Sequence, residues 1–245
     1  EAMEKYAIES SMAKVYCSEL NGRVIDSGLQ MMGGYGFIEE YTMARLYRDC
    51  RIDRIWEGTN EINRQIITGY IMKKALMEEL PIQGAIREIE QYMNNGKLET
   101  DSEILLAESN VVETSKRLAL YLLNEGICEF GQDLKHQQQI ADILANIFID
   151  IYVAESTVLR AKKILGDPAA PSSVEAVAKI FVAEMAQRMM QFAETALKGI
   201  YNGDLSTLIH ENLNMFRSRM YLPTNTIGLK REIAAYAYSK KSYPY

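Results

Sequence analysis

The sequence predicts an all-α protein in which helices pack on helices. Apolar residues recur every three or four positions through most of the 245 residues, and no window alternates between apolar and polar residues for long enough to make a strand. The clearest apolar stripe is Ile140, Ile143, Leu144, Ile147, Phe148, Ile151 and Tyr152. Glycine, asparagine and proline interrupt the pattern at intervals typical of helix ends. Helical layers around an apolar core follow from these observations.

The N-terminal third of the chain predicts three helices. They are expected from about residue 3 to the glycine cluster at 33–36, at about 42–54 and at about 60–79. Pro81 ends the third helix, because proline inside a helix removes a backbone hydrogen bond and clashes with the preceding turn. We therefore expect two domains, 1–80 and 81–245, the second also a helical bundle.

Six more helices are predicted in the second domain. They are expected near 83–94, 102–130, 135–165, 172–201, 204–220 and 227–240. The breaks between them carry turn residues, such as Asn-Gly-Asp at 202–204. Ser172 and Glu175 have the spacing of a capping box, which supports a helix start after Pro171.

The helical spacing of apolar residues begins at the very start of the chain, and no capping residue precedes it. Met3, Tyr6 and Ala7 already lie on one side of the expected helix, and no Ser, Thr, Asp or Asn precedes them. We therefore expect that residue 1 is a boundary within a longer protein.

Composition narrows the possible classes of function. The apolar fraction of 48% and the charged fraction of 24% are typical of a soluble globular protein. The net charge of −6 disfavours a nucleic-acid surface, which needs a concentrated basic patch. No apolar run reaches the roughly 18 residues of a membrane span. Cys17, Cys50 and Cys128 form no C-x-x-C pair, so we expect free, buried thiols in a reducing compartment.

Three motifs between residues 30 and 61 suggest chemistry. They are Gln-Met-Met-Gly-Gly-Tyr-Gly at 30–36, Arg-Asp-Cys-Arg-Ile at 48–52 and Trp-Glu-Gly-Thr-Asn-Glu at 56–61. Their order and spacing resemble the C-terminal signature of the acyl-CoA dehydrogenases, flavoenzymes that desaturate fatty acyl-CoA thioesters. The resemblance covers about residues 1–75 and implies the final part of that family's helical catalytic domain.

The resemblance assigns the catalytic base to Glu57. In the family, a carboxylate removes the proton next to the thioester carbonyl while a hydride leaves the β-carbon for flavin N5. Ile55 and Trp56 are expected to supply apolar surface, and a carboxylate withdrawn from water is a stronger base. Gly58 lets backbone approach a ligand. The alternative is that Glu57 is an ordinary glutamate near a helix N-terminus, where the dipole favours negative charge.

The resemblance also implies FAD as cofactor. Gln30, Met31, Met32, Gly33 and Gly34 match the segment that contacts the adenosine half of FAD, usually that of a neighbouring subunit. The positions that meet the flavin beyond the base are Thr59, Asn60 and Glu61, and those that meet acyl-CoA are Trp56 and Gly58. From the residues alone, a helix C-cap is sufficient to explain Gly33 or Gly34.

Other polar and sulfur-containing clusters favour structural roles. Arg48, Asp49, Arg51, Asp53 and Arg54 suggest a salt-bridged helix face. Asp133 and His136 have a metal-ligand spacing, but the chain has only two histidines and we expect no metal site. The methionines Met185, Met189 and Met190 sit at helical spacing and are expected in the core.

The long segment after Pro81 resembles the longer branch of the family, which includes the very-long-chain enzymes. In that branch an extra C-terminal helical domain accompanies a homodimer. The resemblance thus implies the C-terminal part of a fatty acid β-oxidation enzyme with electron-transfer flavoprotein as acceptor, in the cytoplasm or the mitochondrial matrix. On its own such a part is expected to be inactive.

Two other functions remain open from the sequence. A non-enzymatic helical scaffold or interaction module would fit the same length and composition. A relative acting on nitroalkanes or in flavin-dependent monooxygenation would keep the fold, although such relatives often lack the glutamate. Basic clusters at 160–163 and 230–231 also allow weak attachment to a membrane surface, and a solvated helix face explains them equally.

Overall fold

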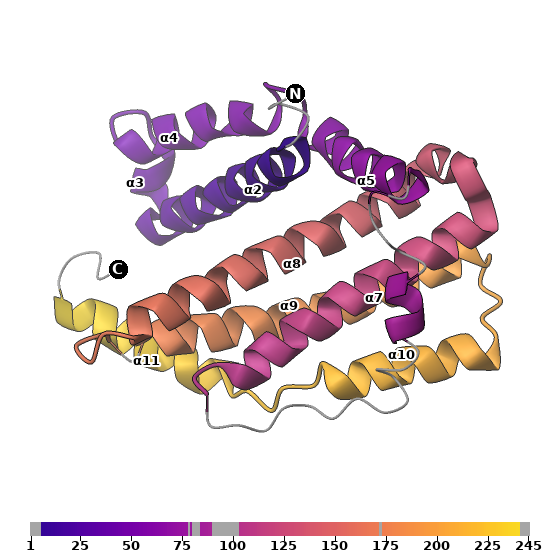
Figure 1. Cartoon of the computed structure of the whole chain (residues 1–245). Helices are drawn as coiled ribbons and strands as arrows, with labels where there is room; N and C mark the ends of the chain where they lie inside the picture. Colours follow the sequence, from indigo (N-terminus) through magenta and orange to yellow (C-terminus); the bar gives the residue numbers. More distant parts are fainter. Residues whose placement is uncertain (1–5, 78, 80–83, 90–102, 172, 241–245) are drawn as a thin grey trace. The chain divides into compact units, whose positions relative to one another are not determined.

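The protein is described by a computed structural model over residues 6–77, 79, 84–89, 103–171 and 173–240. Every regular element in these ranges is a helix, which confirms the predicted all-α class (Figure 1). The elements are α2 (Ala7–Met32), α3 (Gly34–Phe37), α4 (Thr42–Arg51), η1 (Ile52–Arg54), α5 (Asn60–Leu76), α7 (Leu106–Phe130), η2 (Gly131–His136), α8 (Gln138–Leu165), α9 (Ser173–Ile200), α10 (Thr207–Arg219) and α11 (Thr226–Lys240).

Most helix ends fall within a few residues of the sequence-based expectation. The chain differs at 52–54 and at 131–136, where it tightens into the 3₁₀ helices η1 and η2. Such turns are common at helix ends, because they satisfy backbone groups that the helix leaves unpaired. Of the helix expected at 83–94, residues 84–89 are helical; its other residues, and Ser172 of the expected capping box, lie outside the described residues.

The chain divides into two compact units. The first contains α2 to α5 and the beginning of α8, as far as Ile149. The second contains α7, α8 from Asp150 onward, α9, α10 and α11. The first unit thus includes Lys135–Ile149, a segment that the sequence suggested would belong wholly to the second domain.

In the first unit, α2 packs against α4 and α5. The buried apolar side chains on these helices are Met12, Val15, Cys50, Ile67, Ile71 and Met72. The beginning of α8 is attached to α5 by side-chain hydrogen bonds. The Thr68 hydroxyl donates to the Ala141 carbonyl at 2.8 Å, and Arg64 Nε donates to Asn146 Oδ1 at 2.7 Å.

The second unit is organised around α7 and α9, with α11 against α9 and α10 against both. Its largest fully buried side chains include Leu118, Leu122, Leu123, Met185, Met189, Leu197 and Phe216. Met190 is also buried, so the core position predicted for all three methionines of this patch is confirmed. Arg188 on α9 pairs with Asp150 on α8 through two hydrogen bonds of 3.0 and 3.2 Å.

Three further observations bear on the expected class of protein. All three cysteines are free, but only Cys50 is buried; Cys17 and Cys128 are exposed, where burial was expected. None of the described helices combines the length and apolar character needed to cross a membrane. Among the described residues, no three His, Cys, Asp or Glu side chains gather in a way that could hold a metal ion.

Candidate functional site

The predicted base lies in a tight turn between η1 and α5. Glu57 has φ of 55° and Gly58 has φ of 81°, so two consecutive residues occupy the left-handed region. Glycine adopts this region freely, whereas for a residue with a side chain it costs about 1–3 kcal/mol. The turn is therefore held in shape by its surroundings.

The Glu57 carboxylate is exposed to solvent. Its neighbours Ile55 and Trp56 are 47% and 56% exposed, so they present apolar surface beside the carboxylate without covering it. The described residues alone do not form the apolar pocket that was expected around this side chain. Any such enclosure needs another molecule or another part of the protein.

The first turn of α5 favours negative charge. Thr59 is the N-cap, and its hydroxyl oxygen accepts a hydrogen bond from the Ile62 N–H at 3.3 Å. The pKa of the Glu61 carboxyl is lowered, chiefly by its own backbone N–H and by the Thr59 hydroxyl. The positive end of the helix dipole acts in the same direction. This end of α5 thus binds anionic groups favourably.

A buried polar network ties the turn to α2. Asn60 is only 2% exposed, and its amide donates to Ser18 Oγ at 3.0 Å and to Glu19 Oε1 at 3.2 Å. Lys14 Nζ donates to Asn60 Oδ1 at 2.7 Å and to the Gly58 carbonyl at 2.8 Å. The Asn60 side chain is therefore engaged with α2, and the residue as a whole is buried.

The segment predicted to contact FAD adenosine lies on the surface at the end of α2. Gln30 to Gly34 are all exposed, with Met31 at 84%. Gly33 is the C-cap of α2 and has φ of 57°, as the alternative explanation of this glycine requires. A methyl group built onto Gly33 or Gly34 would find no atom within 4 Å, so another molecule can approach this backbone closely.

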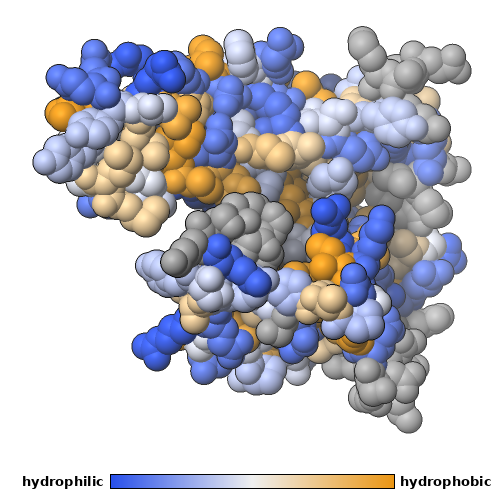
Figure 2. Space-filling model, turned by 90° about the vertical axis from the view of Figure 1, so that its left-hand side faces the viewer, coloured by the Kyte–Doolittle hydropathy of each residue, from blue (hydrophilic) through white to orange (hydrophobic). Residues whose placement is uncertain are grey.

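Large apolar side chains are exposed around this segment. Figure 2 shows apolar side chains gathered on a face of the first unit. The exposed ones between α2 and the turn are Met31, Met32, Tyr35, Phe37, Ile38, Tyr41, Leu46, Tyr47, Ile52, Ile55 and Trp56. So much exposed apolar surface is typical of a site that another molecule or domain covers.

A small cavity rich in arginine opens beside the N-terminus of α5. Its volume is about 320 Å³, and its lining is Glu19, Arg23, Arg51, Arg54, Ile55, Thr59, Asn60 and Glu61. The Nε of Arg54 is buried and has no hydrogen-bond acceptor among the described residues. Arginine donors at a helix N-terminus match the geometry of phosphate oxygens.

The salt-bridged helix face suggested for residues 48–54 is an incomplete description of these side chains. Arg48 pairs with Glu39, whereas Arg51 and Arg54 line the cavity.

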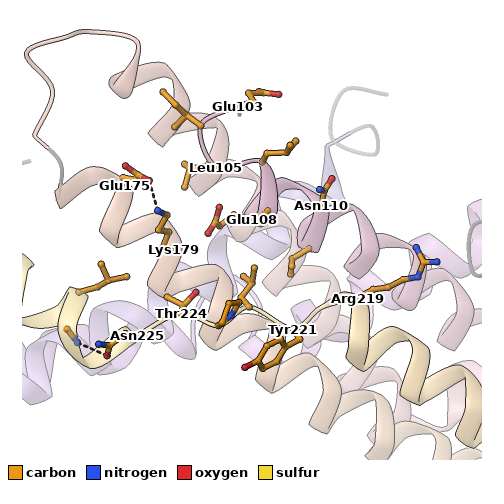
Figure 3. Close-up of a pocket in the computed structure, with 18 of the residues that line it drawn as sticks. Glu103, Leu105, Glu108, Asn110, Glu175, Lys179, Arg219, Tyr221, Thr224 and Asn225 are labelled. Atoms are coloured by element: carbon orange, nitrogen blue, oxygen red, sulfur yellow. Dashed lines mark hydrogen bonds and ion pairs between the residues drawn. The ribbon is translucent and has the colours of Figure 1, made fainter. Parts of the chain in front are cut away.

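The second unit contains a larger pocket, of about 910 Å³ (Figure 3). It lies between the starts of α7 and α9 and the connection from α10 to α11, and none of the predicted site residues lines it. Its polar side chains include Glu108, which is buried, and Lys179, which is half-buried. The ion pair between Lys179 and Glu175, at 2.5 Å, raises the pKa of Lys179. All residues that the motifs predict to take part in catalysis or binding therefore lie in the first unit.

Comparison with known proteins places both units in one family. Residues 1–72 and residues 114–214 each match a family described as "Acyl-CoA dehydrogenase, C-terminal domain". A probable acyl-CoA dehydrogenase of Bacillus subtilis is 35% identical over 99% of this chain. The chain belongs to the acyl-CoA dehydrogenase family.

A solved structure and a further sequence relative support the same assignment. The crystal structure of an acyl-CoA dehydrogenase complexed with FAD, from Bacillus anthracis, matches 99% of this chain with a TM-score of 0.90 and 31% identity. A subunit of the caffeyl-CoA reductase–Etf complex of Acetobacterium woodii is 46% identical over 66 residues, which are 27% of this chain and 17% of that protein. The chain spans 41% of the length of each Bacillus protein.

The motif around Glu57 packs against α2 at Lys14, Ser18 and Glu19, whereas Gln30–Gly34 lies at the C-terminal end of that helix, away from the turn. Two features of the site were not predicted from the sequence. Lys14 lies 44 residues from Gly58 in the sequence, and no short motif joins them. The arginine-lined cavity had a weak signal in the sequence, because Arg51 and Arg54 are three residues apart and lie six to nine residues before the start of α5.

Proposed function

We propose that the chain is the C-terminal part of an FAD-dependent acyl-CoA dehydrogenase in which Glu57 is the catalytic base. The observation that carries the proposal is the Glu57 turn, in which an exposed carboxylate precedes a helix N-terminus and the backbone next to it is tied to α2 by a polar network. The substrate is a fatty acyl-CoA thioester, and Trp56 and Gly58 contact its acyl end.

Glu57 supplies the proton acceptor of the reaction. Its carboxylate accepts the proton from the carbon next to the thioester carbonyl. Among the described residues the Glu57 N–H donates no hydrogen bond, so it is available to the thioester oxygen, where it would stabilise the developing negative charge. The carboxylate and the N–H belong to the same residue, so the φ angle of Glu57 helps to set their relative positions.

Separate parts of the first unit's surface suit different parts of FAD. Bound FAD would supply the hydride acceptor. The open backbone at Gly33 and Gly34 admits an adenosine, and the cavity with Arg51 and Arg54 suits phosphate oxygens. The FAD found with the Bacillus anthracis enzyme supports this assignment. The Etf complex that includes the Acetobacterium relative supports electron-transfer flavoprotein as acceptor.

We assign the second unit to the architecture of a homodimer. Its basic clusters support a membrane role only weakly, because two of their lysines are paired with carboxylates. Lys162 contacts Glu103 at 2.7 Å, and Lys230 contacts Glu184 at 2.5 Å.

Replacing the base tests the proposed reaction. In the full-length enzyme, Glu57→Gln is expected to keep the flavin bound and to slow flavin bleaching by a saturated acyl-CoA by about 10²- to 10⁴-fold, because the amide cannot accept the proton. Glu39→Gln is the control, since Glu39 is an exposed carboxylate paired with Arg48. Undiminished bleaching in Glu57→Gln would exclude Glu57 as the base.

A further inference from the structure

The carbonyl of Gly58 is held by two side chains from different helices. Lys14 Nζ on α2 and Asn63 Nδ2 on α5 each donate to this oxygen at 2.8 Å. Asn63 also donates to the Thr59 carbonyl at 3.1 Å. The Gly58–Thr59 peptide, one residue beyond Glu57, is therefore fixed from two directions.

This turn needs external support because its backbone conformation is unfavourable. Glu57 has a positive φ without being glycine, and Gly58 continues in the same region. Such conformations persist only where neighbouring groups hold them. A methyl group on Gly58 would lie 3.1 Å from Asn63 Nδ2, so Asn63 packs closely against the turn as well as donating to it.

The Lys14 ammonium is itself held in place. It donates to Asn60 Oδ1, and Asn60 is buried and bonded to Ser18 and Glu19. Glu19 in turn accepts from Arg64 Nη2 at 2.6 Å. The lysine thus has a fixed direction toward Gly58, unlike a mobile surface lysine.

We propose that Lys14 and Asn63 are positioning residues that hold the Glu57 turn in the geometry needed for proton removal. The proposal rests on the function proposed for Glu57. Neither side chain takes the proton; each acts through the Gly58 carbonyl on the carboxylate and N–H of the preceding residue. Misplacing a catalytic group by about 1 Å can cost 10²-fold in rate.

The 245-residue chain itself offers a first test, because Trp56 is its single tryptophan and precedes Glu57 directly. Lys14→Met and Asn63→Ala are each expected to lower the fluorescence anisotropy of Trp56 and to increase its quenching by acrylamide. Far-UV circular dichroism shows whether each variant folds, and a variant that does not fold is replaced by the other. Lys198→Met is the control, since it breaks an ion pair with Glu194 on α9. Unchanged anisotropy in the folded variants would refute the positioning role.

The full-length enzyme provides the second test. Lys14→Met is expected to slow flavin bleaching by about 10- to 100-fold while the flavin stays bound, because the turn loses the geometry needed for proton removal. Lys14→Arg, which retains a charged donor, should recover part of the rate. If Glu57→Gln bleaches normally, the proposed function fails and the Trp56 result still stands. If Glu57→Gln is inactive and Lys14→Met is fully active, only the positioning role fails.

Discussion

Glu61 lies in the first turn of α5, where its charged form is favoured by hydrogen bonds and by the helix dipole. Its pKa is lowered from 4.5, so the folded protein binds this proton more weakly than the unfolded chain does. The contribution of Glu61 to stability is therefore fully present above about pH 4.5 and is lost as the pH falls through the lowered value.

Glu61→Gln should consequently show a destabilisation that depends on pH. We expect a loss of about 0.5 kcal/mol in the free energy of unfolding at neutral pH and low salt, because the amide has no charge to interact with the dipole. The difference from the unmodified chain should shrink below pH 4.5. Urea unfolding at several pH values measures this, with Glu211→Gln in the exposed face of α10 as control. A difference that is the same at all pH values would contradict the role of the charge.

At the scale of single residues, local patterns predicted part of the site. The string around Glu57 predicted a turn before a helix, and the helix C-cap offered as the alternative explanation of Gly33 is present at the end of α2. The donors to the Gly58 carbonyl could not be predicted, because Lys14 meets Gly58 only when α2 packs against α5. The exposure of Glu57 also escaped prediction, since apolar neighbours in sequence need not cover a side chain in space.

Among the elements, α8 shows what helical periodicity can and cannot indicate. Its apolar stripe predicted a long helix with a buried face, and that helix is present at Gln138–Leu165. The periodicity does not say which neighbours cover that face. The segment up to Ile149 belongs to the first unit, where Arg64 contacts Asp142 and Asn146, and the rest belongs to the second.

The ion pair between α8 and α9 makes a second prediction about stability. Asp150 is 7% exposed and accepts two hydrogen bonds from Arg188. Arg188→Met leaves that carboxylate buried without its partner and should cost about 2–3 kcal/mol. The double variant Asp150→Asn with Arg188→Met should recover part of this loss, because it removes the uncompensated charge. Chemical unfolding of all four proteins of the cycle measures the coupling, and strictly additive losses would show that the pair contributes nothing.

For the whole molecule, the predicted cofactor contacts are distributed over an open surface. The Gln30–Gly34 segment, the exposed apolar side chains and the turn with Glu57 all face outward from the first unit. Such an open surface does not enclose a dinucleotide. The strength of binding then depends on what else surrounds the ligand.

We therefore predict that the 245-residue chain alone retains no FAD and desaturates no acyl-CoA, although it folds. Binding must offset the translational and rotational freedom that a ligand loses, and a peripheral contact with one small cavity provides too few interactions to do so. The two buried cores are large enough to keep the helices together. Incubation of the chain with FAD, followed by desalting and an absorbance scan, measures retention, and the full-length enzyme is the positive control. A flavin band near stoichiometric occupancy would show that the binding determinants lie within residues 1–245.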